Sequence, residues 1–176
     1  QGPTDDFEVV RSKIAEWLET KPTPVVTVDA VFENLNDGDP ANDPFILSVR
    51  KPEHYELGHV PGAINIPWTQ VAKPENLAKL PSDQPIVDYC YTGHTGQVAM
   101  TALNLMDYDA VNMKFGMMAW TKNDDVLTLA RFEPALVPDY RVETEPNNAA
   151  TYNFPELDTG ASGDAEIGRT AVDSYL

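Results

Sequence analysis

Short apolar runs, separated by polar or helical stretches, dominate the middle of the chain. Runs of this length, alternating with segments of helical periodicity, are typical of parallel strands joined by crossover helices. The pattern therefore predicts an α/β fold in which a central parallel sheet is flanked by helices. The strands are expected at residues 46–49, 64–66, 86–87 and 111–113.

The only cysteine of the chain, Cys90, stands at the end of the third apolar run, and a polar turn containing glycine follows it. Helical spacing from Ala99 onward predicts a helix that begins near Thr95 or Gly96. A cysteine at such a turn faces the positive end of the helix dipole and unpaired backbone N–H groups, which stabilise a thiolate. We therefore interpret Cys90 as a nucleophile rather than as a small core side chain, although cysteine commonly lies in protein interiors.

Three motifs ordered around this cysteine loop resemble the rhodanese family. Residues 47–50 and 53–67 match the family signature before the loop, and residues 111–120 resemble its closing strand, glycine turn and tryptophan helix. The resemblance covers roughly residues 24–125. It implies a rhodanese-like fold and a cysteine that accepts sulfane sulfur as a persulfide and passes it on.

From this resemblance we expect a thiosulfate sulfurtransferase of the rhodanese type, with small molecules as sulfur donor and acceptor. Sulfane sulfur from thiosulfate or a similar donor would pass through a Cys90 persulfide to cyanide or a thiol. Two alternatives stay open. One is a non-enzymatic sulfur-carrier or protein-binding module that serves a dedicated partner, and the other is a stacking repeat that serves assembly.

The loop after the cysteine is the expected substrate-binding element, because its backbone N–H groups and two threonine hydroxyls can surround the outer sulfur of a persulfide. Rhodaneses that use thiosulfate carry Arg or Lys in this loop. Here only His94 can become cationic, so we expect modest transfer from thiosulfate. Gly96 occupies the position of the arginine that related phosphatases need, which argues against phosphatase chemistry. The expected binding residues are Tyr91, Thr92, Gly93, His94 and Thr95.

Two further residues, Arg50 and Asp88, are expected to support the site. The family usually has Asp at the position of Ser48, whereas this chain has Asp88 two residues before Cys90. The two strands are neighbours in the rhodanese sheet order, so we expect Asp88 to pair with Arg50 or another buried donor. Strand alternation places Asp88 on the same side as Cys90, where an unpaired carboxylate would disfavour the thiolate. We interpret Arg50 as a structural organiser rather than a substrate ligand.

The composition argues against several classes of partner. The chain has 28 acidic and 12 basic residues and a formal charge of −16, which argues against nucleic acid and anionic membrane surfaces. No apolar run is long enough for membrane insertion. His54, Cys90 and His94 lack metal-ligand spacing, so neither a metal nor another cofactor is expected. The start at Gln1 is compatible with export after removal of a leader, and otherwise with the cytoplasm.

The two ends of the chain resemble each other, at residues 6–18 and 164–176. Self-similarity at a fixed offset is typical of duplication, so we interpret the second segment as the opening helix of a further repeat. The recurring residues are Asp6, Glu8, Arg11 and Leu18, which return as Asp164, Glu166, Arg169 and Leu176.

Four segments are therefore predicted: an N-terminal amphipathic helix in residues 1–23, a rhodanese-like domain in 24–131, an extended proline-containing arm in 132–163 and a C-terminal helix in 164–176. We expect the arm to lie on the domain surface. The two terminal helices are expected to compete for one groove or to pair between molecules, which would cause self-association. The first helix has an apolar face of Phe7, Val10, Ile14, Trp17 and Leu18, which Ala165 and Gly168 weaken in the second.

Overall fold

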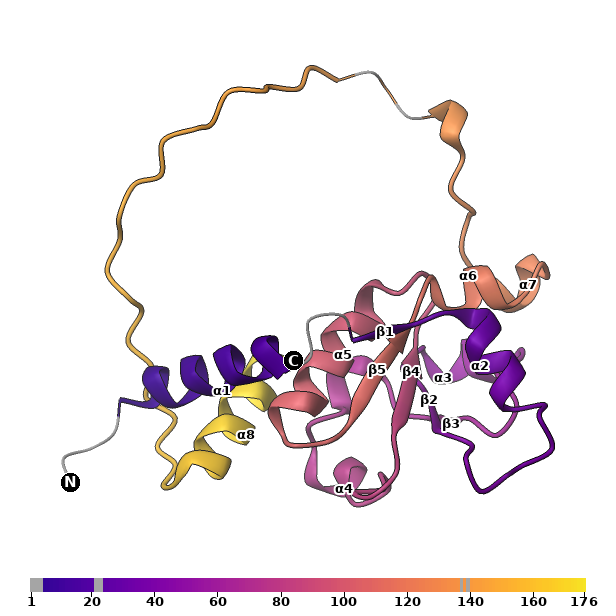
Figure 1. Ribbon diagram of the computed structural model, residues 1–176, viewed down its shortest axis with the longest axis horizontal. Coiled ribbons are helices and arrows are strands. Elements are labelled where there is room, and N and C mark those ends of the chain that lie inside the picture. Colours follow the sequence, from indigo (N-terminus) through magenta and orange to yellow (C-terminus); the bar gives the residue numbers. More distant parts are fainter. Residues whose placement is uncertain (1–4, 21–23, 137, 139) are drawn as a thin grey trace.

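The computed structural model describes residues 5–20, 24–136, 138 and 140–176, and a parallel β-sheet lies at its centre (Figure 1). Within the described residues the sheet has five strands in the order β1-β5-β4-β2-β3, and every neighbouring pair is parallel. The predicted α/β fold is confirmed. The two-residue edge strand β1 was not among the predicted strands. The strands are β1 (Val25–Val26), β2 (Phe45–Ser48), β3 (Ile64–Asn65), β4 (Ile86–Tyr89) and β5 (Ala110–Met113).

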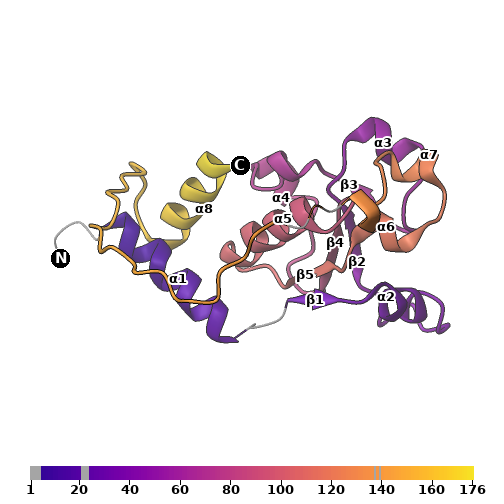
Figure 2. The same cartoon turned by 90° about the horizontal axis from the view of Figure 1, so that it is seen from above.

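Helices cover both faces of the sheet (Figure 2). Because side chains alternate along a strand, Ile86 packs with Leu103 of α5 on one face, whereas Val87 packs with Met117 of α6 on the other. The first face carries η1 (Trp68–Gln70), α4 (Pro74–Leu77) and α5 (His94–Leu105). The second face carries α2 (Val28–Asn34), α3 (Pro52–Glu56), α6 (Gly116–Trp120) and α7 (Asp124–Leu127). The remaining elements are α1 (Asp6–Thr20), η2 (Pro134–Leu136) and α8 (Asp164–Tyr175).

Helix α5 begins at His94, one residue before the earliest start that the helical spacing predicted. Gly93 has a φ of 94°, a left-handed conformation that glycine adopts without steric cost, and this turn carries the chain from β4 into the helix. The connecting loop is therefore residues 90–93 rather than 90–95. Thr95 consequently lies in the first turn of α5.

The terminal helices α1 and α8 pack against each other, and both contact α5 (Figures 1 and 2). The expected competition for one groove is wrong, because both helices are docked at once. In α1 the buried residue is Val9, whereas Leu18, assigned to the apolar face, is 54% exposed. Gly168 is buried against α1: a Cβ atom there would lie 3.4 Å from Lys13 Cδ. The absent side chain thus brings the two helices close rather than weakening their contact.

Residues 140–153 arc away from the domain instead of lying on its surface (Figure 1). Tyr140 and Tyr152 are exposed along this segment. The arm returns at α1, where the Phe154 ring stacks on Phe7 with centroids 5.2 Å apart. There the backbone N–H and the hydroxyl of Thr159 donate to the Asp6 carboxylate at 2.7 and 2.6 Å. The expectation that the arm packs on the domain is therefore wrong for all but its end.

Candidate functional site

The cysteine loop lies at the carboxyl end of β4, between the sheet and the N-terminus of α5. The Cys90 side chain is buried, and its sulfur accepts a hydrogen bond from the backbone N–H of Gly93 at 3.1 Å. The N-terminus of a helix presents unpaired N–H groups and a positive partial charge, and both stabilise an anionic sulfur. The geometry therefore holds a sulfur atom where negative charge is favoured.

A glycine turn after β5 holds this loop from the other side. The backbone N–H groups of Met117 and Met118 donate to the carbonyl oxygens of Cys90 and Tyr91 at 3.0 and 2.8 Å. Gly116 begins α6 with a φ of +51°, and a Cβ atom there would overlap the Cys90 carbonyl. The tight turn that the sequence predicted at Gly116 is present, and its closeness to the loop requires glycine.

Asn112 of β5 also fastens the loop, although the sequence analysis did not select it. Its side-chain amide donates to the Gly93 carbonyl at 2.9 Å. The available signal was a buried amide in an otherwise apolar run, between Val111 and Met113. A buried polar side chain needs a hydrogen-bond partner, and here that partner is the loop.

Tyr91 ties the loop to α3 on the opposite face of the sheet. Its hydroxyl forms a hydrogen bond with His54 Nδ1 at 2.6 Å and accepts the backbone N–H of Lys51 at 3.2 Å. The guanidinium carbon of Arg50 lies 5.2 Å from the centre of the Tyr91 ring, within the range of a cation–π contact. Of the predicted binding residues, Tyr91 is thus the one whose side chain is anchored to the domain body.

Arg50 is fully buried and donates to three backbone carbonyls, those of Gly58 at 2.8 Å, His54 at 2.7 Å and Val126 at 2.5 Å. This arrangement agrees with a structural organiser. The expected pairing of Asp88 with Arg50 is wrong. Arg50 reaches toward α3 and α7, whereas Asp88 faces α5, on the other side of the sheet.

Asp88 is fully buried. Within the described residues, neither of its carboxyl oxygens has a partner in hydrogen-bonding geometry. Burial raises the pKa of Asp88 well above its ordinary value, the nearby charge of Cys90 raises it further, and the backbone N–H of Met100 opposes the change. The surroundings of Asp88 therefore favour the neutral form of its carboxyl group. The strand register pairs Asp88 with Asn112, whose side-chain oxygen likewise lacks a donor.

Gly96 lies beside both of these side chains in the first turn of α5. A Cβ atom on Gly96 would overlap the Asn112 side-chain oxygen and lie 3.4 Å from Asp88 Oδ1. Packing therefore excludes any larger side chain at the position where related phosphatases need arginine, which agrees with the argument against phosphatase chemistry.

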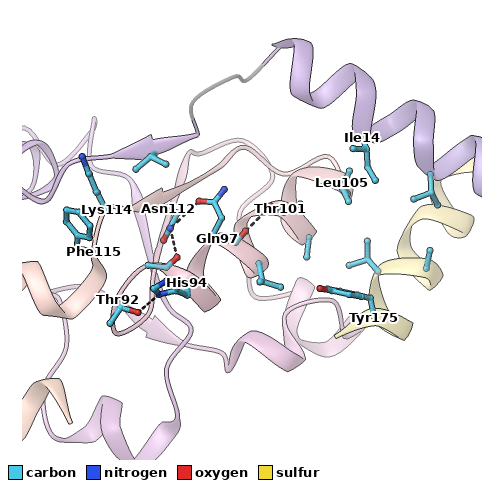
Figure 3. A pocket seen from close by; sticks show the side chains of 17 residues that line it. Ile14, Thr92, His94, Gln97, Thr101, Leu105, Asn112, Lys114, Phe115 and Tyr175 are labelled. Carbon is cyan, nitrogen blue, oxygen red and sulfur yellow. Dashed lines mark hydrogen bonds between the residues drawn. The ribbon is translucent and has the colours of Figure 1, made fainter. Parts of the chain in front are cut away.

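The remaining predicted binding residues lie at the outer edge of the loop. The Thr92 hydroxyl and His94 Nδ1 are 2.7 Å apart (Figure 3), and the His94 side chain is exposed. Thr95 is half-buried in α5. The structure thus brings residues 90–95 together around one strand-to-helix turn, while Arg50 supports it from the opposite face.

A groove of about 1100 Å³ extends from this edge of the loop along α5 to α1 and α8 (Figure 3). Thr92, Gly93 and His94 line its end next to the loop. Lys114 and Phe115, which follow β5, lie beside them, and the sequence analysis selected neither. The loop has no Arg or Lys of its own, so Lys114 provides a cation that only the tertiary structure places here.

Two kinds of feature are absent from the described residues. Within the described residues, no group of three or more His, Cys, Asp or Glu side chains is arranged to hold a metal ion. None of the helices in the described ranges combines the length and the apolar character needed to cross a bilayer.

The chain belongs to the rhodanese-like domain family, whose model matches residues 27–123. It is 37% identical over 78 residues to the probable adenylyltransferase/sulfurtransferase MoeZ of Mycobacterium tuberculosis, a match that covers 44% of this chain and 20% of that protein. It is 29% identical over 99 residues to the putative sulfur carrier protein YrkF of Bacillus subtilis, covering 56% and 51%. The chain thus spans about a fifth of the length of MoeZ and about half that of YrkF.

The fold is similar to that of a rhodanese-like domain protein from Staphylococcus aureus, with a TM-score of 0.50 and 28% identity. That match covers 55% of this chain and 90% of the other. The comparisons confirm the resemblance expected from the three sequence motifs and assign the chain to the rhodanese-like domain family.

Proposed function

We propose that this protein is a sulfurtransferase in which Cys90 carries sulfane sulfur as a persulfide. The observation that supports this proposal most directly is the position of the Cys90 sulfur, 3.1 Å from the Gly93 nitrogen at the start of α5. Backbone donors and the helix dipole favour both the attacking thiolate and the persulfide anion that replaces it. No charged side chain within the loop is needed for this effect.

The reaction with thiosulfate has two steps. The Cys90 thiolate attacks the outer sulfur of thiosulfate, a new S–S bond forms, and the S–S bond of the donor breaks with its electron pair leaving on sulfite. In the second step cyanide attacks the outer sulfur of the persulfide, which releases thiocyanate and restores the thiolate. The backbone N–H groups of residues 91–95 are the proposed donors to the transferred sulfur, with the Thr92 and Thr95 hydroxyls as further donors.

The test is the intact mass of the protein after incubation with thiosulfate, with Cys90→Ser as the control. We expect a gain of one sulfur atom that depends on Cys90 and that cyanide reverses. If no mass is gained while the thiol still reacts with an alkylating agent, thiosulfate is not the donor. If no sulfane-sulfur donor at all produces the gain, the proposal is wrong.

A sulfur-carrier or protein-binding role is the second candidate. One observation favours it over a fast small-molecule enzyme: the cysteine loop contains no Arg or Lys to attract an anionic donor. In this role the persulfide would pass to the thiol of a partner protein. Single-turnover kinetics separate the two candidates, because a carrier should load with sulfur yet turn over cyanide only slowly.

A further inference from the structure

Three buried oxygen atoms that lack a hydrogen-bond partner within the described residues gather beside the first turn of α5. They are Oδ1 and Oδ2 of Asp88 on β4 and Oδ1 of Asn112 on β5. The parallel register pairs these two residues on the face of the sheet that α5 covers. Asp88 is fully buried and Asn112 is 4% exposed. A buried acceptor without a donor costs free energy, so a group of three requires an explanation.

Gly96 shows that two of these oxygens border the same space. A Cβ atom on Gly96 would overlap Asn112 Oδ1 and lie 3.4 Å from Asp88 Oδ1. Any side chain at position 96 would fill this space, and glycine leaves it to the two polar groups. The carboxyl group and the amide oxygen can therefore approach each other directly.

The orientation of the Asn112 amide follows from its partner in the loop. The amide nitrogen donates to the Gly93 carbonyl at 2.9 Å (Figure 3). A carbonyl oxygen can only accept, so the nitrogen of the amide must face the loop. The amide oxygen consequently points toward Gly96, on the side where Asp88 lies, and it needs a donor there.

The described residues around Asp88 leave a proton on its own carboxyl group as the available donor. Its register partner on β2 is Leu47, and Gly96 and Met100 face it from α5. None of these three has a charged or polar side chain, and the Met100 backbone N–H lies outside hydrogen-bonding geometry. Cys90, in the loop after β4, is the ionisable group whose charge acts on Asp88. Burial raises the pKa of Asp88, which favours this proton.

We propose that Asp88 is a positioning residue of the cysteine loop: its protonated carboxyl group donates a hydrogen bond to Asn112 Oδ1 and thereby fixes the amide that holds Gly93. One proton serves two of the three oxygens, because it makes one of them a donor to another. The Gly93 N–H in turn donates to the Cys90 sulfur at 3.1 Å. The effect of this relay on sulfur transfer rests on the proposed function, whereas the hydrogen bonds do not.

Two uncharged substitutions separate the donor from the charge at position 88. Asp88→Asn supplies an amide N–H at every pH, whereas Asp88→Leu keeps the branched shape and has no donor. If the carboxyl group is a donor in the folded protein, the wild type at neutral pH should behave as Asp88→Asn does and differ from Asp88→Leu. Asp88→Ala, which also lacks a donor, replaces Asp88→Leu if the larger side chain prevents folding.

The relay is tested first by hydrogen exchange at the Gly93 amide, measured by NMR spectroscopy on the full chain at neutral pH. Asp88→Leu should raise the exchange rate about fivefold, the usual effect of one lost hydrogen bond, while Asp88→Asn should stay within about twofold of the wild type. Ile86→Ala is the control for lost packing, because it truncates a buried side chain at the other end of β4. It should leave exchange at Gly93 near the wild-type rate.

The role of Asn112 is tested by the rate of sulfur loading of Cys90 from thiosulfate, measured as mass gain. Asp88→Leu should load about fivefold more slowly than Asp88→Asn, since it lacks the donor. When Asn112→Ala is added to each variant, this difference should vanish, because the amide that position 88 orients is gone. Both substitutions at position 88 are uncharged, so the comparison contains no direct effect of charge on the sulfur.

Each contrary result has a definite meaning. Equal exchange at Gly93 in Asp88→Asn and Asp88→Leu would overturn the proposal, and so would a wild type that exchanges as fast as Asp88→Leu. A difference in loading that persists with Asn112→Ala would show that position 88 does not act through Asn112. If the wild type gains no sulfur from any sulfane-sulfur donor, the proposed function is wrong, and exchange at Gly93 still decides whether the relay exists.

Discussion

Asp88 on β4 and Cys90, in the loop that follows β4, both face α5. Burial and the neighbouring sulfur raise the pKa of Asp88 well above its ordinary value, which favours the protonated carboxyl group. From the sequence, Asp88 was expected to pair with Arg50 or another buried donor, because an unpaired carboxylate there would disfavour the thiolate. The neutral form lacks the negative charge that would have this effect.

A raised pKa in the folded state makes stability depend on pH in a defined direction. Asp88 contributes stability that is fully present below its unfolded pKa and is lost as the pH rises through its folded pKa. Between the two values the loss is about 1.4 kcal/mol per pH unit at most. Asp88→Asn should remove this loss, so that the variant gains on the wild type as the pH rises.

Urea unfolding at a series of pH values, from acidic to mildly alkaline, measures the free energy of unfolding of wild type and Asp88→Asn. The contributions of the other titrating groups cancel in the difference, because both proteins contain those groups. Asp83→Asn, an exposed carboxyl, is the control. Parallel stability curves for wild type and Asp88→Asn would show that Asp88 ionises in the folded protein as it does in the unfolded one.

Gly116 carries a second residue-scale prediction. Gly116→Ala should lower both stability and sulfur loading, because the new methyl group overlaps the Cys90 carbonyl and displaces the loop. Gly38→Ala is a matched control, since Gly38 has a φ of +87° and no atoms near its Cβ position. It should cost only the backbone strain, about 1 kcal/mol, with no change in loading. Equal effects of the two changes, by urea unfolding and mass gain, would mean that the overlap at Gly116 is relieved by local movement.

At the scale of elements, α8 completes the face of the domain that α5 and α1 form. Ile167 and Val172 are buried there, and Val172 belongs to the same cluster as Leu103 of α5. Ending the chain after Asp158 should therefore lower the free energy of unfolding by about 3–6 kcal/mol, from two buried aliphatic side chains. The shortened chain should also self-associate, since the exposed face of α1 can pair between molecules as the sequence analysis expected. Urea unfolding and sedimentation measure the two effects, and an unchanged stability would show that α8 docks only weakly.

Electrostatics act on the molecule as a whole. A formal charge of −16 repels thiosulfate, so its second-order rate of sulfur loading should rise several-fold as salt increases from about 10 mM to about 150 mM. The matched pair of reagents is iodoacetate and iodoacetamide, which alkylate Cys90 with and without a negative charge. Only iodoacetate should respond to salt. A rate that falls with salt would show that the local charge of Lys114 outweighs the global repulsion.

The sequence by itself determined the fold class and the position of the cysteine loop. Apolar runs specify strands buried on both faces, and the turn residues Gly93 and Gly116 are local requirements of backbone geometry, so both are visible along the chain. The tertiary structure alone decided which polar groups meet. Asn112 reaches the loop, Arg50 turns away from Asp88, and Lys114 supplies the cation that the loop lacks. These contacts depend on strand register and on which face of the sheet each side chain occupies, and long-range packing sets both. The similarity of the two terminal helices predicted that they would compete for one groove. Long-range packing decided otherwise, because in the folded chain the helices pack side by side and form one wall of the groove.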